Sequence, residues 1–393
     1  MAGPWGDTDS ADAPPPPPPF EEEEEVAAPE DVREFPCDSC GGDLRFNPAR
    51  GLLICQHCGD EQEMSARHGA TDGLRELDFE AAIARRLPEA EIEETRVLNC
   101  TNCGAQVEFE PTVHAAECPF CATPVVTDTG THRHIKPKGV LPFVYDEPAA
   151  HDAMEEWFGK LWFAPNGLKQ YARKGRPMNG IYVPYWTFDA DTKSSYRGER
   201  GTVYYVNRTV TVDGKRQTKR VAKVRWRSVS GRVARFFDDV LVLGSRSLPK
   251  RFADALPPWD LGALEPYTPQ YLAGFRAEGY TLELKDAFVD ARHQMDRIIE
   301  RDVRFDIGGD RQRVHRVDTQ VDDVTFKHIL LPVWTAAYRY QGKSYRCLVN
   351  GQTGRVQGER PYSAWKIAFV AVLALILAGC VGYLWAISET GGF

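Results

Sequence analysis

Eight of the ten cysteines fall into four Cys-x-x-Cys pairs, a spacing typical of metal-binding turns. The pairs form two sets, and in each set 14 residues separate the first pair from the second. A segment of this length can form a β-hairpin that places the second turn opposite the first, so that each turn directs two sulfurs to one ion. We therefore expect two metal sites, one formed by Cys37, Cys40, Cys55 and Cys58 and the other by Cys100, Cys103, Cys118 and Cys121.

Four thiolates form a closed tetrahedral site, with Zn–S distances of about 2.3 Å and no coordination position left for a substrate. The sequence therefore predicts two structural Zn²⁺ ions, each held in a small zinc ribbon whose folding depends on the metal. Glycine follows the second cysteine in three of the four turns, at Gly41, Gly59 and Gly104, where it can relax the backbone. An iron site that carries electrons is the alternative, since four thiolates on a similar hairpin also bind iron.

A second cluster of charged side chains lies between residues 193 and 235. This stretch contains thirteen basic residues and two acidic ones. Its alternation places Lys223, Arg225 and Arg227 on one face of a strand and Val224 and Trp226 on the other. Such a basic sheet can contact anionic lipid headgroups, a protein partner or the phosphates of a nucleic acid, or it can simply be a solvated face.

The remaining sequence indicates how these groups are positioned. We expect an α+β fold in which a short helix at 77–86 lies between the two ribbons. Further helices are expected at 152–163 and 284–303, and strands over 181–243 and again from 313. The predicted units are an acidic, proline-rich disordered tail (1–34), ribbon 1 (35–62), a linker (63–96), ribbon 2 (97–128), an α+β domain (129–360) and a C-terminal anchor (361–393).

The predicted α+β domain contains a weak internal sequence repeat. Pro184-Tyr185-Trp186 and Pro332-Val333-Trp334 are each preceded by an apolar residue and followed, about ten residues later, by a Ser-Tyr-Arg triplet. This pattern favours two related β units packed together. Both tryptophans are expected in the core.

Ile367 to Ile387 is a run of 21 residues without a charge. About 20 apolar residues suffice to span a bilayer as a helix, and Tyr383 and Trp385 suit the membrane interface. Only six residues follow, which predicts a tail-anchored protein with a single span. Basic residues precede the span and none follows it, so the bulk of the chain is expected to face the cytoplasm. A reducing compartment also agrees with cysteines kept for metal.

Composition and missing motifs narrow the function classes. The formal net charge is −8, but residues 1–34 alone contribute −10, so the remaining chain is close to neutral. The first twenty residues lack the basic and apolar regions of a signal peptide. Gly342-Lys343-Ser344 is the nearest match to a phosphate-binding loop, but the required upstream glycine is Ala337. We find no hydrolase or zinc-protease motif and expect no enzyme.

The combination of features resembles a bacterial family with two TFIIB-type zinc ribbons, a mixed domain and one C-terminal membrane helix. The resemblance covers roughly residues 35–388 and rests on the eight cysteines, the two Pro-x-Trp segments and the block from Val349 to Ser363. Members are often labelled "primosomal protein N′ (replication factor Y), superfamily II helicase", a label that transfers poorly because this chain lacks helicase motifs. The family also resembles proteins that work beside phage-shock protein A and stomatin/flotillin-type (SPFH) membrane scaffolds.

This resemblance implies an adaptor or scaffold at the bacterial inner membrane, in an envelope-stress or membrane-scaffold complex. A zinc-ribbon protein that binds nucleic acid in replication or transcription, without helicase activity, is the first alternative. An iron-binding redox protein is the second.

Overall fold

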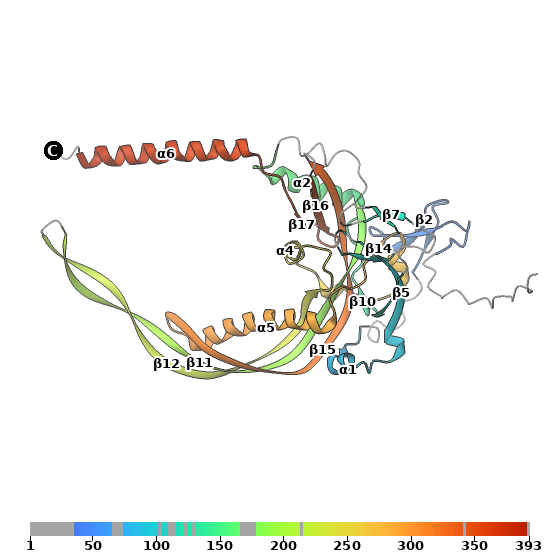
Figure 1. The fold of residues 1–393 in the computed structure, drawn as a ribbon, viewed down its shortest axis with the longest axis horizontal. Coiled ribbons are helices and arrows are strands. Elements are labelled where there is room, and N and C mark those ends of the chain that lie inside the picture. The colour runs from blue at the N-terminus through green and yellow to red at the C-terminus, as the bar shows by residue number, and fades with distance from the viewer. Residues whose placement is uncertain are drawn as a thin grey trace, which may run out of the picture. The chain divides into compact units, whose positions relative to one another are not determined.

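The chain folds as an α+β protein with one large curved sheet and a long helix on its concave side (Figure 1). The computed structural model describes residues 35–64, 74–100, 102, 104–108, 115–118, 120, 124–126, 130–165, 178–212, 215–340 and 343–390. The predicted acidic tail, two of the eight cysteines and part of the linker lie outside these residues.

Within the described residues the large sheet has nine strands, five of which follow the order β12-β11-β15-β10-β13. In addition, β14 pairs with β11 and β4 pairs with β15. β16 also pairs with β15, and β17 pairs with β16. Its strands are β4 (Leu77–Asp78), β10 (Gly139–Val140), β11 (Asn179–Val212), β12 (Lys215–Leu243), β13 (Glu265–Pro266), β14 (Arg276–Ala277), β15 (Arg311–Tyr340), β16 (Lys343–Asn350) and β17 (Val356–Gly358).

Three small sheets in the described part of the chain accompany it. One has the order β1-β2-β3, another β6-β5-β9, and β7 pairs with β8. Their bounds are β1 (Leu44–Asn47), β2 (Leu52–Cys55), β3 (Glu61–Gln62), β5 (Ile92–Asn99), β6 (Gln106–Glu108), β7 (Ala115–Glu117), β8 (Pro124–Val126) and β9 (Gly130–Ile135).

The helices follow from their apolar spacing and caps. In α5 the buried positions, among them Ala287, Ala291, Met295 and Ile299, recur every three or four residues and face the sheet. The helices are α1 (Phe79–Ile83), α2 (Glu147–Lys160), α4 (Lys250–Ala253), α5 (Leu284–Ile307) and α6 (Ala364–Thr390), with short 3₁₀ turns η1 (Glu89–Glu91), η2 (Leu261–Ala263) and η3 (Pro269–Leu272).

Two helix boundaries differ from the expected ones. α2 begins five residues earlier than predicted, because the Asp146 side chain caps it by accepting the Ala149 N–H at 2.9 Å. α1 is only five residues long, since Asp78 caps its start and Arg85 turns into the left-handed region at φ 54° just beyond its end. The predicted long strands and the helix α5 agree with the structure.

The two Pro-x-Trp segments lie on neighbouring strands of the large sheet. β11 and β15 run antiparallel, and the residues that precede the two segments, Val183 and Leu331, pair with each other. Trp186 donates from Nε1 to the Leu282 carbonyl at 3.0 Å, two residues before α5 begins. Trp334 donates to the Tyr145 carbonyl at 2.8 Å, two residues before α2 begins. Both indoles are buried, and each ties its strand to the start of a helix.

The return strands of these two segments end in the same way. The Gly244 N–H, just after β12, donates to the Pro184 carbonyl at 2.9 Å, and the Gly351 N–H, just after β16, donates to the Pro332 carbonyl at 2.8 Å. α2, β11 and β12 therefore correspond in position to α5, β15 and β16. Counting back from the two glycines, Leu241 of β12 corresponds to Leu348 of β16.

Candidate metal centre and membrane anchor

The first cysteine set comes together as a cluster of four sulfurs. Cys37 and Cys40 precede β1, Cys55 ends β2, and Cys58 lies in the following turn. All four Sγ atoms lie within 4.8 Å of one another. The Cys37–Cys58 and Cys40–Cys55 sulfur pairs are 3.6 and 3.5 Å apart, which is far from a disulfide bond. This cluster could bind a metal ion.

The sulfur spacing fits a tetrahedral ion. Four sulfurs at about 2.3 Å from a central zinc lie about 3.8 Å from one another, close to the separations found here. Two backbone amides, those of Cys58 and His57, point at the Cys55 sulfur and lower the pKa of this thiol to about 6, whereas the pKa values of the other three thiols are raised, that of Cys37 chiefly by desolvation. The thiolate is the form that binds metal, so these amides favour the liganding state at neutral pH.

The backbone around each turn explains the glycines. Gly41 and Gly59 have φ values of 73° and 77°, in the left-handed region that glycine adopts without strain. The Gly41 N–H donates to the Cys37 carbonyl at 2.8 Å, and the Gly59 N–H donates to the Cys55 carbonyl at 3.0 Å. These turns hold the two cysteines of each pair on the same side.

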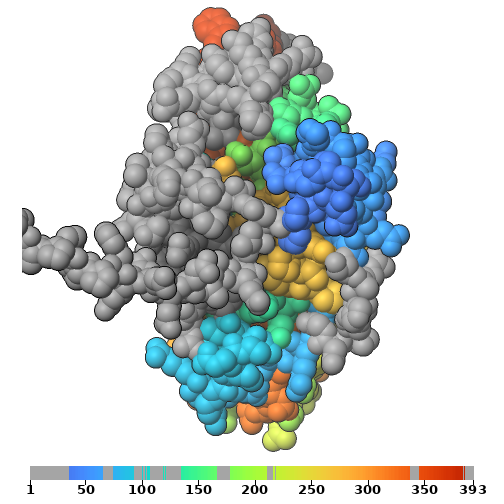
Figure 2. Space-filling view, turned by 90° about the vertical axis from the view of Figure 1, so that its right-hand side faces the viewer, coloured from blue at the N-terminus to red at the C-terminus, as the bar shows by residue number. Residues whose placement is uncertain are grey.

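The first cysteine unit shares its core with the rest of the protein. Phe46 of β1 is buried and packs edge-on against Tyr271, with ring centroids 5.4 Å apart. Its N–H also donates to the Ala273 carbonyl at 3.0 Å. Figure 2 shows this unit, in blue, against the yellow-orange residues of that region. The cluster is thus fixed to the body of the protein by apolar contacts as well as by its own turns.

The second cysteine set is described in part. Cys103 and Cys121 lie outside the described residues, whereas Cys100 and Cys118 are both buried. The turn after Cys100 repeats that of the first set: the Gly104 N–H donates to the Cys100 carbonyl at 2.8 Å, and Gly104 has a φ of 74°. The structure therefore gives this turn the same geometry, while the predicted second metal ion stays a prediction.

α6 is long and apolar enough to cross a membrane. Its stretch Ala364–Tyr383 has 20 residues, and the apolar residues of this stretch are not buried against the rest of the described chain. An apolar helix without a buried face is unfavourable in water, because its whole surface stays solvated. The predicted span over Ile367–Ile387 lies within α6.

A loop from the body is attached to the start of α6. Lys366 donates from Nζ to the carbonyls of Trp162 and Ala164, at 3.0 and 2.8 Å. The Ser363 N–H donates to the Phe163 carbonyl at 2.8 Å. Trp162 is 62% exposed and Trp365 is 81% exposed, so aromatic rings surround the point where the apolar helix begins. Aromatic rings at this level are typical of a membrane interface.

The predicted basic sheet, residues 193–235, forms the distal part of the β11–β12 hairpin, and its end projects beyond β15. β15 pairs with β11 only as far as Gly201 and Arg311, so residues beyond Gly201 form a two-stranded ribbon, which projects past α5 in Figure 1. As expected, Lys223 and Arg225 are exposed and Trp226 is half-buried. The exposed basic side chains described in this ribbon are Arg208, Arg216, Lys219, Arg220, Lys223 and Arg225.

A partly buried ionic cluster surrounds Lys327, and no sequence pattern predicted it. The carboxylates of Asp189, Asp238 and Asp239 lie within 4.8 Å of one another, an arrangement that could itself hold a cation. Lys327, however, places its ammonium group 3.6 Å from Asp189 and 2.9 Å from Asp239, and also pairs with Glu76 at 3.0 Å. The lysine thus supplies the compensating positive charge. Glu76 and Lys327 lie 251 positions apart, so no local pattern indicated the pair.

Comparison with known proteins gives one distant relative and no family assignment. The chain is 26% identical over 338 residues to a Bacillus subtilis protein described as "Uncharacterized protein YdjG", covering 86% of this chain and 92% of that protein. No protein-family model matches the sequence, and no solved structure matches the fold.

Proposed function

We propose that the protein is a zinc-binding, tail-anchored adaptor of the bacterial inner membrane, with its bulk facing the cytoplasm. The observation that carries this proposal is the combination of a closed four-sulfur cluster and an unburied apolar helix on the same α+β body. A closed site suits a structural metal and not a catalytic one. The metal would then stabilise the conformation of a surface that binds a partner protein at the membrane.

The metal in this proposal is Zn²⁺ at Cys37, Cys40, Cys55 and Cys58, with a second ion at Cys100, Cys103, Cys118 and Cys121. The repeated turn at Cys100 supports the second site. Iron is the alternative occupant of the same thiolates, and metal analysis separates the two.

The orientation follows from the charges beside α6. Arg355, Arg360 and Lys366 precede the span, and Glu389 follows it. Basic residues favour the cytoplasmic side, so the body would lie in the cytoplasm with a short C-terminal end across the membrane. The exposed Trp162 and Trp365 would then lie at the cytoplasmic headgroup level.

For the partners, the resemblance described above favours phage-shock or SPFH-type scaffold proteins. The test is crosslinking and affinity purification of the full-length protein from membranes under mild detergent. Wild type is compared with a variant in which the eight paired cysteines are serine, and with Cys380→Ser as the matched control. Recovery of a membrane-scaffold protein by wild type and Cys380→Ser, but not by the eight-serine variant, supports the adaptor. Recovery of no protein by any of the three contradicts it.

Nucleic-acid binding is the second candidate, favoured by the basic ribbon. Arg220 stacks over Tyr205 at 4.4 Å, and Arg225 lies 5.3 Å from the ring centre of Tyr204, so cations and aromatic rings alternate along an exposed surface. Such a surface suits phosphates and bases, but also anionic lipid headgroups. A salt-dependent mobility shift of DNA or RNA by the full chain in neutral detergent would favour this candidate. No shift at low salt would exclude it.

A further inference from the structure

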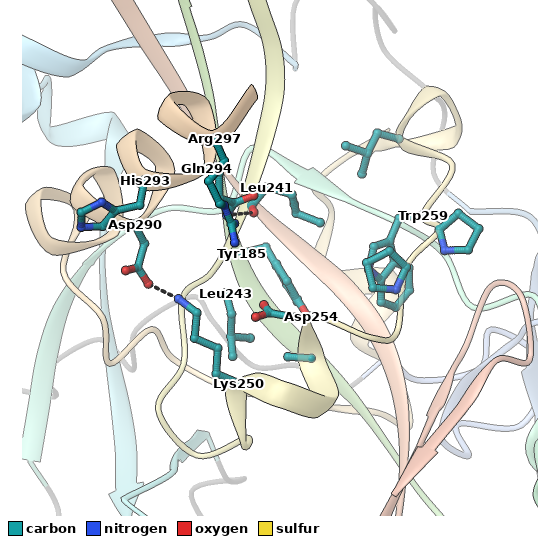
Figure 3. A pocket seen from close by; sticks show the side chains of 14 residues that line it. Tyr185, Leu241, Leu243, Lys250, Asp254, Trp259, Asp290, His293, Gln294 and Arg297 are labelled. Atoms are coloured by element: carbon teal, nitrogen blue, oxygen red, sulfur yellow. Dashed lines mark hydrogen bonds and ion pairs between the residues drawn. The ribbon is translucent and has the colours of Figure 1, made fainter. Parts of the chain in front are cut away.

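A cleft of about 820 Å³ lies at the open edge of the large sheet, between β12, α5 and the segment from α4 to η2 (Figure 3). Leu241 and Leu243 form its floor, Trp259 lies on one side, and Gln294 and Arg297 of α5 lie on the other. β12 is the last strand on this side of the sheet, so among the described residues no strand covers its outer edge here.

The corresponding edge of β16 is covered by a strand. β17 pairs antiparallel with β16, and its Val356, Gln357 and Gly358 face Val349, Leu348 and Cys347. Leu348 corresponds to Leu241, as counted from Gly351 and Gly244. The cleft therefore occupies the place beside β12 that β17 fills beside β16.

The backbone groups of β12 point into this space. Because Gly244 bonds to β11, the strand alternation turns the N–H and C=O groups of Leu241 and Leu243 away from β11 and toward the cleft. The Gln294 side chain donates from Nε2 to the Leu241 carbonyl at 3.0 Å. An amide side chain thus makes the hydrogen bond that a backbone N–H of an added strand would make.

Two further donors lie at the cleft without a hydrogen-bond partner within the described chain. These are the Tyr185 hydroxyl and the Trp259 indole N–H, both buried, and the Tyr185 side chain is only 3% exposed. A buried donor without a partner is costly, so these groups favour a ligand with hydrogen-bond acceptors.

We propose that this cleft binds an extended segment of a partner protein, which adds to β12 as an antiparallel strand in the position that β17 takes beside β16. Main-chain hydrogen bonds to Leu241 and Leu243 would provide the affinity. Alternate side chains of the segment would face opposite walls. Every second side chain would lie on the same face as Leu241, contact Tyr185 and Trp259, and carry a hydrogen-bond acceptor. The intervening side chains would lie on the opposite face, toward Arg297.

This proposal deepens the adaptor function, because it names a surface that recruits a partner, and it depends on neither the metal nor the membrane helix. The probe is a fluorescent synthetic peptide with the sequence of residues 354–360, which contains β17 itself. It is titrated against the full-length protein in neutral lipid nanodiscs by fluorescence anisotropy. Hydrogen exchange of the Leu241 and Leu243 amides is followed in parallel.

We expect saturable binding and slower exchange of the Leu241 and Leu243 amides. Methylation of the peptide nitrogen at its glutamine should weaken binding about ten-fold, because it removes one strand hydrogen bond worth about 1.4 kcal/mol. Gln294→Ala should bind several-fold more tightly, since it removes the intramolecular competitor for the Leu241 carbonyl. Gln294→Trp should keep binding, because α2 carries Trp157 at the corresponding position, 12 residues after Tyr145 as Gln294 is 12 after Leu282, and β17 still pairs with β16 there.

Equal binding of the methylated and unmethylated peptides would overturn the proposal, as would unchanged exchange of the two amides at millimolar peptide. Zinc content and membrane retention of both Gln294 variants are measured alongside and should match wild type. If those two properties fail in wild type while the peptide binds, the adaptor assignment is wrong and the strand-binding cleft stands.

Discussion

The Sγ atoms of Cys40 and Cys55 lie 3.5 Å apart, although the two residues belong to opposite turns of the hairpin. Because these sulfurs are close enough to share one ion, replacing either of them should change the metal content of the protein. Cys55→Ser should lose one equivalent of zinc from the purified full-length protein, since three thiolates and a hydroxyl bind zinc more weakly. Elemental analysis checks this, with Cys380→Ser as the control that keeps full content. Iron in place of zinc would support the redox alternative.

The placement of Cys380 predicts a membrane-dependent reactivity. In the described structure this thiol is exposed on α6, yet it lies within the apolar stretch. A membrane-impermeant maleimide should therefore leave Cys380 unlabelled in intact vesicles and label it once detergent has dissolved them. Ser230→Cys, on the exposed β12 surface, should react in inside-out vesicles without detergent. Labelling of Cys380 in sealed vesicles would show that α6 does not span the membrane.

The ionic cluster around Lys327 predicts a large cost for removing its cation. Lys327 is 7% exposed and Asp189 is 3% exposed, so Lys327→Met would leave the Asp189 carboxylate buried without a counter-charge. We expect a loss of about 3–5 kcal/mol in the free energy of unfolding. Chemical denaturation of the detergent-solubilised protein measures it. The double variant Lys327→Met/Asp189→Asn should recover part of the loss, and no recovery would mean that the lysine acts through packing alone.

Acid sensitivity should depend on His328. Burial lowers the pKa of this imidazole to about 4 from its usual 6.5, and its Nδ1 lies 2.7 Å from the Ile135 carbonyl. The unfolded chain therefore binds a proton that the folded chain excludes, so stability falls as the pH drops from 6.5 toward 4. The loss should approach about 3 kcal/mol at the lower end. His328→Gln should flatten this slope in denaturation curves taken across that range, whereas His315→Gln, at an exposed position, should not.

The local parts of the fold follow from the sequence, and the non-local parts do not. The three-and-four spacing of Phe288, Ala291, Met295, Ile298 and Ile299 predicted α5, and the cysteine spacing predicted the first cluster. The cleft depended on the assembly of the sheet, which no local pattern carries: β17 covers β16, whereas no strand among the described residues covers the outer edge of β12. The Lys327–Glu76 pair and the contact of Phe46 with Tyr271 likewise join distant segments. Such contacts depend on how the sheet is assembled.

The free end of the β11–β12 hairpin has a consequence for self-association. Beyond Gly201 no third strand among the described residues pairs with β11 or β12, and an unpaired strand edge is a template for pairing with another molecule. The lysines and arginines along this ribbon make two copies repel each other, which opposes edge-to-edge aggregation. Polyanions that neutralise these charges would remove the repulsion, and copies crowded on an acidic membrane surface could then align their ribbons into a continuous β-structure.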